Sequence, residues 1–165
     1  MNFPMPVMDP CPFCEIARGN SAWNLLVEDP LTLTLLNGRQ YETGQCIVMP
    51  RRHAPTLLDL TAHEAAAVML AVQRVGAVIT KAFEPEALLL YQNNGVLSGQ
   101  EVPHFHMHVV PRTRGSDWGL GPTHLAHLQS EARPTHLDHA VVTDAKLNTV
   151  RTLQGEIAGG LKRRG

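Results

Sequence analysis

The chain has little of what marks several protein classes. Only three of its 165 residues are cysteine, 5% are aromatic, and 14 basic residues face 15 acidic ones, for a net charge of −1. This balance, without basic clusters, argues against a surface that coats nucleic acid, and no uninterrupted apolar run approaches the ~18 residues that span a bilayer. The N-terminus also lacks a charged start followed by an apolar run. We therefore expect a cytoplasmic protein that binds neither nucleic acid nor a membrane.

The length and the 44% hydrophobic content fit one globular domain that buries its own core. We expect residues 1–10, which hold three prolines, to form a flexible arm and residues 11–113 to form the domain. Residues 114–165 form a C-terminal extension for which the sequence predicts no definite structure, including Asp117 and Trp118. The final basic residues, 162–164, are expected to be a solvated tail.

Three histidines alternate with apolar residues near position 105. Because strand side chains alternate between faces, this spacing puts one group on a common face: His104, His106 and His108. The opposite face carries the apolar group: Phe105, Met107 and Val109. The first and third histidines are about 13 Å apart in a regular strand, so a single metal ion cannot bind all three. A lone strand histidine is usually just solvated, but this alternation favours a site divided along its length.

The remaining pattern predicts an α+β fold. Thr61 and Glu64 form a capping box, and apolar residues then recur every three or four positions to about Lys81, which indicates one long central helix. A short N-terminal helix is expected over Phe13–Ala17, closed by Gly19. The expected strands of an antiparallel sheet are Trp23–Val27, Leu31–Leu36, Gln45–Met49, Ala87–Gln92 and His104–Val110.

Cys11 and Cys14 form a Cys-x-x-Cys motif. In a cytosolic protein such a pair is metal-binding or redox-active before it is a disulfide, and this one precedes the first strand instead of following one as in thioredoxin-like proteins. A closed zinc site needs four ligands, so two would have to come from elsewhere in the chain. The alternative is a pair of reduced cysteines in an N-terminal turn. Cys46, by contrast, is expected in the core.

The histidine run resembles the signature of the histidine triad (HIT) family, His-φ-His-φ-His-φ-φ, in which φ is apolar. Residues 44–53, Gly-Gln-Cys-Ile-Val-Met-Pro-Arg-Arg-His, resemble a second family stretch, and residues 93–95 and 99–103 resemble the loop before the triad. The pattern covers roughly residues 11 to 113 and is closest to the fragile-histidine-triad branch. The resemblance implies a HIT-like sheet, a homodimer and a purine nucleotide substrate.

The resemblance also implies partners for the two cysteines. His53 and His104 lie in segments matching those from which some family members, and the related hexose-phosphate uridylyltransferases, supply two histidines to a Cys-x-x-Cys site. The implied structural zinc would be held by four residues: Cys11, Cys14, His53 and His104. It would fix the N-terminal segment against the active strand and leave the other two triad histidines free.

In the family pattern His106 is the nucleophile. A neutral imidazole attacks the α-phosphorus and forms a nucleotidyl-histidine that water hydrolyses, and a histidine pKa near 6.5 leaves much of it neutral at pH 7. Its other ring nitrogen is expected to donate to a backbone carbonyl. His108 would contact the phosphate oxygens. We therefore expect a nucleotide hydrolase or transferase acting on dinucleoside polyphosphates or related conjugates and releasing a nucleoside monophosphate.

Polar residues outside the triad are further candidates. The pattern assigns Asn37 to the ribose hydroxyls, Asn93 to the phosphates and Gln100 to the loop beside them. The alternative for Asn37 is a turn residue, and the alternative for Asn93 and Gln100 is loop capping.

The chain departs from the pattern at Gln45, where the family usually has histidine. Glutamine can hydrogen-bond the phosphate or leaving group but cannot carry a proton between pH 5 and 8. This favours a polyphosphate leaving group over an amine, and Glu101, where the phosphoramidase branch often has serine, points the same way. It also leaves open a non-catalytic module of the family that binds nucleotides or signals.

Overall fold

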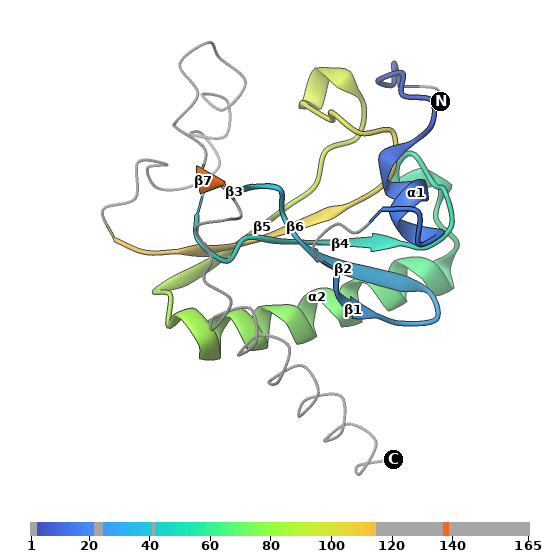
Figure 1. Cartoon of the computed structure of the whole chain (residues 1–165). Helices are drawn as coiled ribbons and strands as arrows, with labels where there is room; N and C mark the ends of the chain where they lie inside the picture. The colour runs from blue at the N-terminus through green and yellow to red at the C-terminus, as the bar shows by residue number, and fades with distance from the viewer. Residues whose placement is uncertain (1–2, 22–24, 41, 115–136, 139–165) are drawn as a thin grey trace.

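A five-stranded antiparallel sheet forms the centre of the molecule (Figure 1). The computed structural model describes residues 3–21, 25–40, 42–114 and 137–138. The strands, in spatial order, are β1 (Leu25–Glu28), β2 (Thr32–Leu36), β4 (Cys46–Pro50), β6 (Met107–Arg112) and β5 (Ala87–Tyr91). Together with one long and one short helix they confirm the predicted α+β fold.

The shorter elements lie around this sheet. They are α1 (Pro12–Ala17), β3 (Arg39–Gln40), β7 (Leu137–Asp138) and the 3-10 turns η1 (Leu57–Asp59) and η2 (Val96–Ser98). The β3–β7 pair was not predicted. Trp23, Asp117, Trp118 and the basic tail 162–164 lie outside the described residues, as does most of the expected extension.

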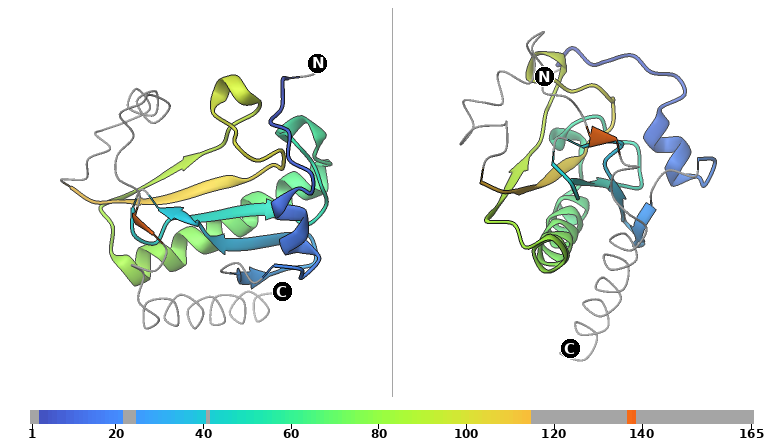
Figure 2. Two further views of the ribbon diagram at one scale, coloured as in Figure 1. Left: turned by 45° about the horizontal axis from the view of Figure 1, so that its top comes forward. Right: turned by 60° about the vertical axis from the view of Figure 1, so that its left-hand side comes forward.

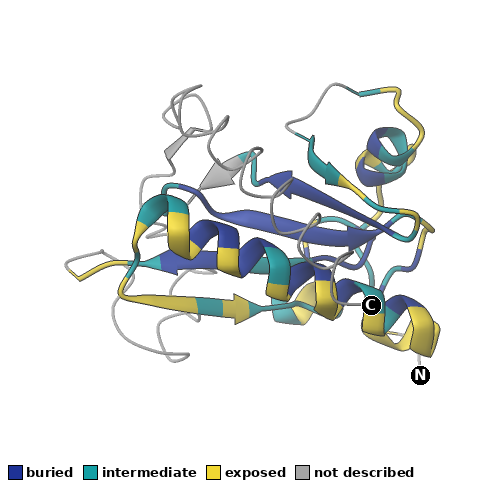
Figure 3. Ribbon diagram, turned by 90° about the horizontal axis from the view of Figure 1, so that it is seen from below, coloured by how far each residue is buried: buried dark blue, intermediate teal, exposed yellow. Residues whose placement is uncertain are grey.

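The long helix is α2 (Ala62–Phe83), and it begins with the predicted capping box. Thr61 Oγ accepts a hydrogen bond from the Glu64 amide at 3.2 Å, and the Glu64 carboxylate accepts one from the Thr61 amide at 2.9 Å. The helix ends at Phe83, two residues beyond the expected end, and its C-cap residue Glu84 is in the left-handed conformation. By length and composition α2 would suffice to cross a membrane. Its apolar stripe packs against the sheet, however, as in the core helix of a globular domain (Figure 3).

The sheet has a core on each face. On one face α2 packs its buried valines and Ile79 against Val48, Phe105 and Val109, with Cys46 beside them as predicted. On the other face Phe13 and Ile16 of α1 pack against residues of β2 and β4: Leu33, Leu35, Ile47 and Met49. In the views of Figure 2, α1 lies on the side of the sheet away from α2. Each fully buried side chain of this size contributes roughly 1.5–3 kcal/mol. The two layers fix α1, and thus the Cys-x-x-Cys motif, on the face opposite α2.

The histidine run begins before its strand. Pairing of β6 with β4 starts at Met107, opposite Val48, so the expected strand from His104 is wrong by three residues. Two hydrogen bonds outside the strand ladder explain this: the His104 amide turns back to the Val102 carbonyl at 2.8 Å, and the Phe105 amide donates to the Ala54 carbonyl beyond the end of β4. The alternation of faces is nevertheless confirmed.

The N-terminal arm contacts the segment around Gly95, and its expected flexibility stays a prediction. The Val96 amide donates to the Pro4 carbonyl at 2.9 Å, and a Cβ on Gly95, whose φ is +88°, would lie 2.9 Å from Phe3 Cβ. The arm therefore rests against the loop that leads into the triad. The proposed domain boundaries stay predictions.

Candidate active site and metal centre

The four predicted ligands meet at one point, which we call the metal cluster: Cys11, Cys14, His53 and His104. Their ligand atoms all lie within 4.8 Å of one another, and Cys14 Sγ lies 3.2 Å from His53 Nδ1 and 3.6 Å from His104 Nδ1. Zinc bond lengths of 2.0–2.3 Å in a tetrahedron give ligand separations of roughly 3.5 Å. Two thiols and two imidazoles at these distances fit a closed zinc site.

The ring of His104 is oriented for ligation. Its Nε2 lies 2.9 Å from the Pro50 carbonyl, which only accepts, so Nε2 carries the proton and the Nδ1 lone pair faces the two thiols. Complete burial lowers the pKa of His104 to about 4. The neutral ring that a metal needs is thus the resting form, and a carbonyl behind a ligating histidine is a common supporting contact.

The Cys14 thiol holds its proton in the absence of a cation. Burial and the neighbouring Cys11 raise the pKa of Cys14 to about 11. Ligation requires thiolates, so metal binding at this cluster must release protons and weaken as pH falls.

One ring nitrogen of His106 donates a hydrogen bond, and the other keeps its lone pair. Its Nδ1 donates to the His104 carbonyl at 2.7 Å, as expected, which leaves the lone pair on Nε2. Burial lowers its pKa below the ordinary value, against the effect of that hydrogen bond, so the ring is neutral at pH 7. The Phe13 ring meets it edge-on at 5.2 Å between centroids. These contacts present an unprotonated nitrogen in a fixed orientation.

The His108 ring contacts three side chains, those of Gln45, Tyr91 and His106. Gln45 Nε2, which can only donate, lies 3.2 Å from His108 Nδ1, so the proton of the neutral ring is on Nε2. Burial and neighbouring His106 lower the pKa of His108 well below its ordinary value. The Tyr91 ring stacks on it, and the His106 ring lies at 4.8 Å between centroids. His108 therefore offers an N–H donor beside the His106 nitrogen.

The other predicted substrate residues are spread around this pair. Asn37 is half-buried just after β2, and its backbone amide donates to the Gln45 backbone carbonyl at 2.9 Å. Asn93 is half-buried two residues after β5, where its backbone carbonyl accepts a hydrogen bond from the Gln92 side chain. The buried Gln100 side chain bonds to the Gly95 amide and to the Pro55 and Val102 carbonyls, which corresponds to the loop-capping alternative. A substrate that bound the Gln100 side chain would have to displace these side-chain bonds.

Sequence reasoning missed several residues that shape the site. Phe13 was counted only as part of a short helix, and Tyr91 only as a strand residue. Tyr91 lies directly opposite His108 in the β5–β6 register, so a correct strand pairing would have found it. Arg52 and Glu64 were read as a basic motif position and a helix cap, although they pair with each other.

The HIT domain family matches residues 18–115, more than half of the chain. The chain belongs to the HIT family. The match begins after the Cys-x-x-Cys motif, so the metal cluster joins residues inside the family match to two outside it.

HIT relatives of several named activities are similar to the chain. Protein hit of Bacillus subtilis is 32% identical over 136 residues, 82% of this chain and 92% of that protein. The adenosine 5′-monophosphoramidase of Schizosaccharomyces pombe is 33% identical, covering 67% and 80%. The bifunctional bis(5′-adenosyl)-triphosphatase/adenylylsulfatase of Arabidopsis thaliana is 36% identical, covering 52% of this chain and 48% of that protein, so the chain spans about half of it. The relatives do not single out one branch of the HIT family.

A solved HIT structure shares the fold. The zinc-bound histidine triad family protein from Mycobacterium smegmatis superposes with a TM-score of 0.71, over 92% of this chain and 98% of that one, at 23% identity. At this identity the likeness concerns the fold.

Proposed function

We propose that the protein is a nucleotide hydrolase or transferase that works through a nucleotidyl-His106 intermediate. One observation carries the proposal: the contacts of His106 and His108 fix both rings as neutral tautomers with complementary roles. His106 keeps a lone pair on Nε2, and His108 keeps a proton on Nε2. A nucleophile thus lies beside a hydrogen-bond donor, as phosphoryl chemistry requires.

The reaction has two steps. His106 Nε2 attacks the α-phosphorus, and the bond from phosphorus to the leaving group breaks. Water then cleaves the phosphorus–nitrogen bond and releases a nucleoside monophosphate. The His108 N–H stabilises the negative charge that builds up on the phosphate oxygens in both steps.

The substrate we favour is a dinucleoside polyphosphate, as in the fragile-histidine-triad branch. Similar relatives are named as a phosphoramidase and as a triphosphatase/adenylylsulfatase, which share cleavage beside an adenylyl group and differ in the leaving group. Gln45 lies next to the triad and cannot supply a proton. A polyphosphate leaves as a stable anion and needs such a proton less than an amine does. Asn37 and Asn93 remain our candidates for the ribose and the phosphates.

A structural zinc ion belongs to the proposal. Cys11, Cys14, His53 and His104 would hold it, supported by the geometry of the cluster. When bound, the ion would supply a fixed cross-link between α1 and the residues around the triad. The reacting nitrogen of His106 is two residues from His104, so this cross-link would steady the nucleophile.

We also infer a cytoplasmic homodimer. Its support in this structure is β5, which is the last strand of the sheet and exposes Leu88 and Leu90, 37% and 44% accessible. Exposed apolar residues on an edge strand favour association with another copy. Light scattering of the purified chain measures the mass directly.

The test of the function is His106→Asn, which keeps a polar side chain of similar size but removes the nucleophile. Turnover of diadenosine polyphosphates should fall by about 10⁴–10⁶-fold, while AMP binding measured by calorimetry persists. His63→Ala, at an exposed histidine of α2, is the control and should leave turnover unchanged. Near-normal turnover by His106→Asn would contradict the proposal, and wild-type binding without turnover would favour the non-catalytic module.

A further inference from the structure

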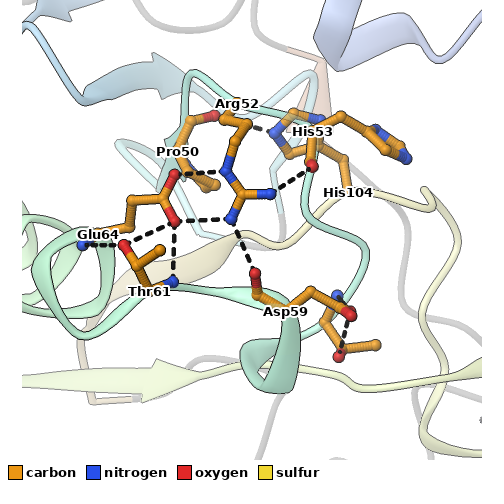
Figure 4. A network of polar contacts seen from close by, with 8 residues as sticks. Pro50, Arg52, His53, Asp59, Thr61, Glu64 and His104 are labelled. Atoms are coloured by element: carbon orange, nitrogen blue, oxygen red, sulfur yellow. Dashed lines mark hydrogen bonds and ion pairs between the residues drawn. The ribbon is translucent and has the colours of Figure 1, made fainter.

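An ion pair between the exposed Arg52 and the buried Glu64 joins the start of α2 to the loop that carries a metal ligand (Figure 4). Arg52 binds Glu64 through two hydrogen bonds of 2.7 Å, from Nε and from Nη2 to the two carboxylate oxygens. The Glu64 side chain is 9% exposed, and the pairing with Arg52, helped by Thr61, lowers its pKa to about 2. Glu64 therefore serves the helix cap and the ion pair at the same time.

The same guanidinium holds two backbone carbonyls. Nη2 also donates to the Asp59 carbonyl at 2.8 Å, and Nη1 donates to the His53 carbonyl at 3.3 Å. A planar guanidinium can satisfy these directions together, whereas a lysine ammonium cannot. Arg52 thus connects the cap of α2, the turn η1 and the backbone of His53.

His53 depends more on its backbone than the other three ligands do. Cys11 and Cys14 belong to the start of α1, which is anchored by buried Phe13 and Ile16. The ring of His104 is buried and bonded to the Pro50 carbonyl. His53 is exposed, and its described ring contacts are with members of the metal cluster itself, Cys14 and His104. Its position before a metal binds is therefore set mainly by the loop backbone.

We propose that Arg52 and Glu64 are positioning residues for the metal cluster and couple its occupancy to the N-terminus of α2. The proposal rests on the zinc site of the proposed function. Arg52 fixes the His53 backbone before the metal binds. Less conformational entropy is therefore lost when His53 becomes the fourth ligand. Because linkage is reciprocal, metal binding must stabilise the first turn of α2 by the same factor by which this contact strengthens metal binding.

Two variants separate the parts of this contact. Arg52→Lys keeps the charge but loses the planar fork, and Glu64→Gln keeps a residue that suits a capping box while removing the charge. Their matched controls are Arg74→Lys and Asp29→Asn, at the 2.6 Å ion pair that joins α2 to the turn between β1 and β2. Each control makes the corresponding change, Arg to Lys or carboxylate to amide, at another ion pair that anchors the same helix.

The measurement is the zinc dissociation constant, obtained by competition between the purified protein and a chromophoric chelator. Contacts behind metal ligands are typically worth about 10–100-fold in affinity, so we expect about tenfold weaker binding for Arg52→Lys and Glu64→Gln. The controls should match the wild type. Hydrogen exchange adds a second readout: zinc should slow exchange of the Thr61 and Glu64 amides in the wild type, and less so in Arg52→Lys.

Failure of the zinc site and failure of the coupling would give different results. A wild type that binds no zinc would overturn the zinc site and the coupling with it. Tight zinc binding by the wild type and equally tight binding by Arg52→Lys and Glu64→Gln would overturn the coupling alone. Equal weakening in the controls would also overturn it, because the effect would then reflect general stability. If Arg52→Lys does not fold, Glu64→Gln decides.

Discussion

Tyr91 and His108 lie stacked across the β5–β6 pair, with ring centroids 4.2 Å apart and an angle of 10° between the ring planes. Gln45 reaches the same imidazole and bonds to its Nδ1. Tyr91 thus fixes the plane of the His108 ring, and Gln45 fixes its tautomer. This arrangement determines where its Nε2 proton points.

Replacing the ring of Tyr91 should misplace His108. We expect Tyr91→Leu to lower kcat by about 10- to 100-fold, because small displacements of catalytic groups cost factors of this size. Tyr91→Phe retains the stacked ring and should keep kcat within a few-fold of the wild type. The measurement is steady-state kinetics of the three proteins, with thermal unfolding to confirm folding. Equal loss in both variants would assign the effect to the hydroxyl instead of the stacked ring.

Gln45→His should change leaving-group preference. Histidine restores a titratable proton source, which is typically worth about 10²–10⁴-fold where the leaving group needs protonation. We expect a larger gain with adenosine phosphoramidates than with diadenosine polyphosphates, compared as kcat/KM. Equal acceleration of both substrates would show that Gln45 does not set selectivity. No acceleration of either would favour the binding-module alternative.

The metal cluster gives a prediction with an internal control. Cys14→Ser should lower zinc content from about one ion per chain and lower the melting temperature, since the cross-link between α1 and the triad region is lost. Cys46→Ala, at a cysteine buried in the core on the opposite face, should leave zinc content unchanged. Elemental analysis of the untagged proteins checks both. Unchanged metal content and melting temperature in Cys14→Ser would remove the site.

The sequence predicted the parts of the fold that follow local rules. The capping box at Thr61 and the recurring valines located α2, because helix start signals and helical periodicity are properties of neighbouring residues. Alternation around position 105 separated Phe105 from the histidines for the same reason. The start of β6 was missed because it depends on where β4 ends, at Pro50, which is distant in the sequence.

The site residues also fall into two groups, those that sequence patterns or family resemblance predicted and those that depend on tertiary contacts. The four members of the metal cluster were found because family resemblance supplied the long-range pairing that Cys11 and Cys14 alone do not contain. Tyr91 was missed because its role arises from cross-strand register, and the pairing of Arg52 with Glu64 because it joins a loop to a helix cap. Contacts of this kind are set by tertiary structure, which residue type and local spacing do not encode.

The central claim is the covalent intermediate on His106, and single-turnover labelling tests it most directly. The enzyme is mixed in excess with a diadenosine polyphosphate radiolabelled at the α-phosphates, denatured within the first turnover and digested. We expect an acid-labile, alkali-stable label on the peptide that contains residues 104–108, present in the wild type and absent from His106→Asn. Turnover by the wild type without any labelled protein, or a label that persists in His106→Asn, would contradict it.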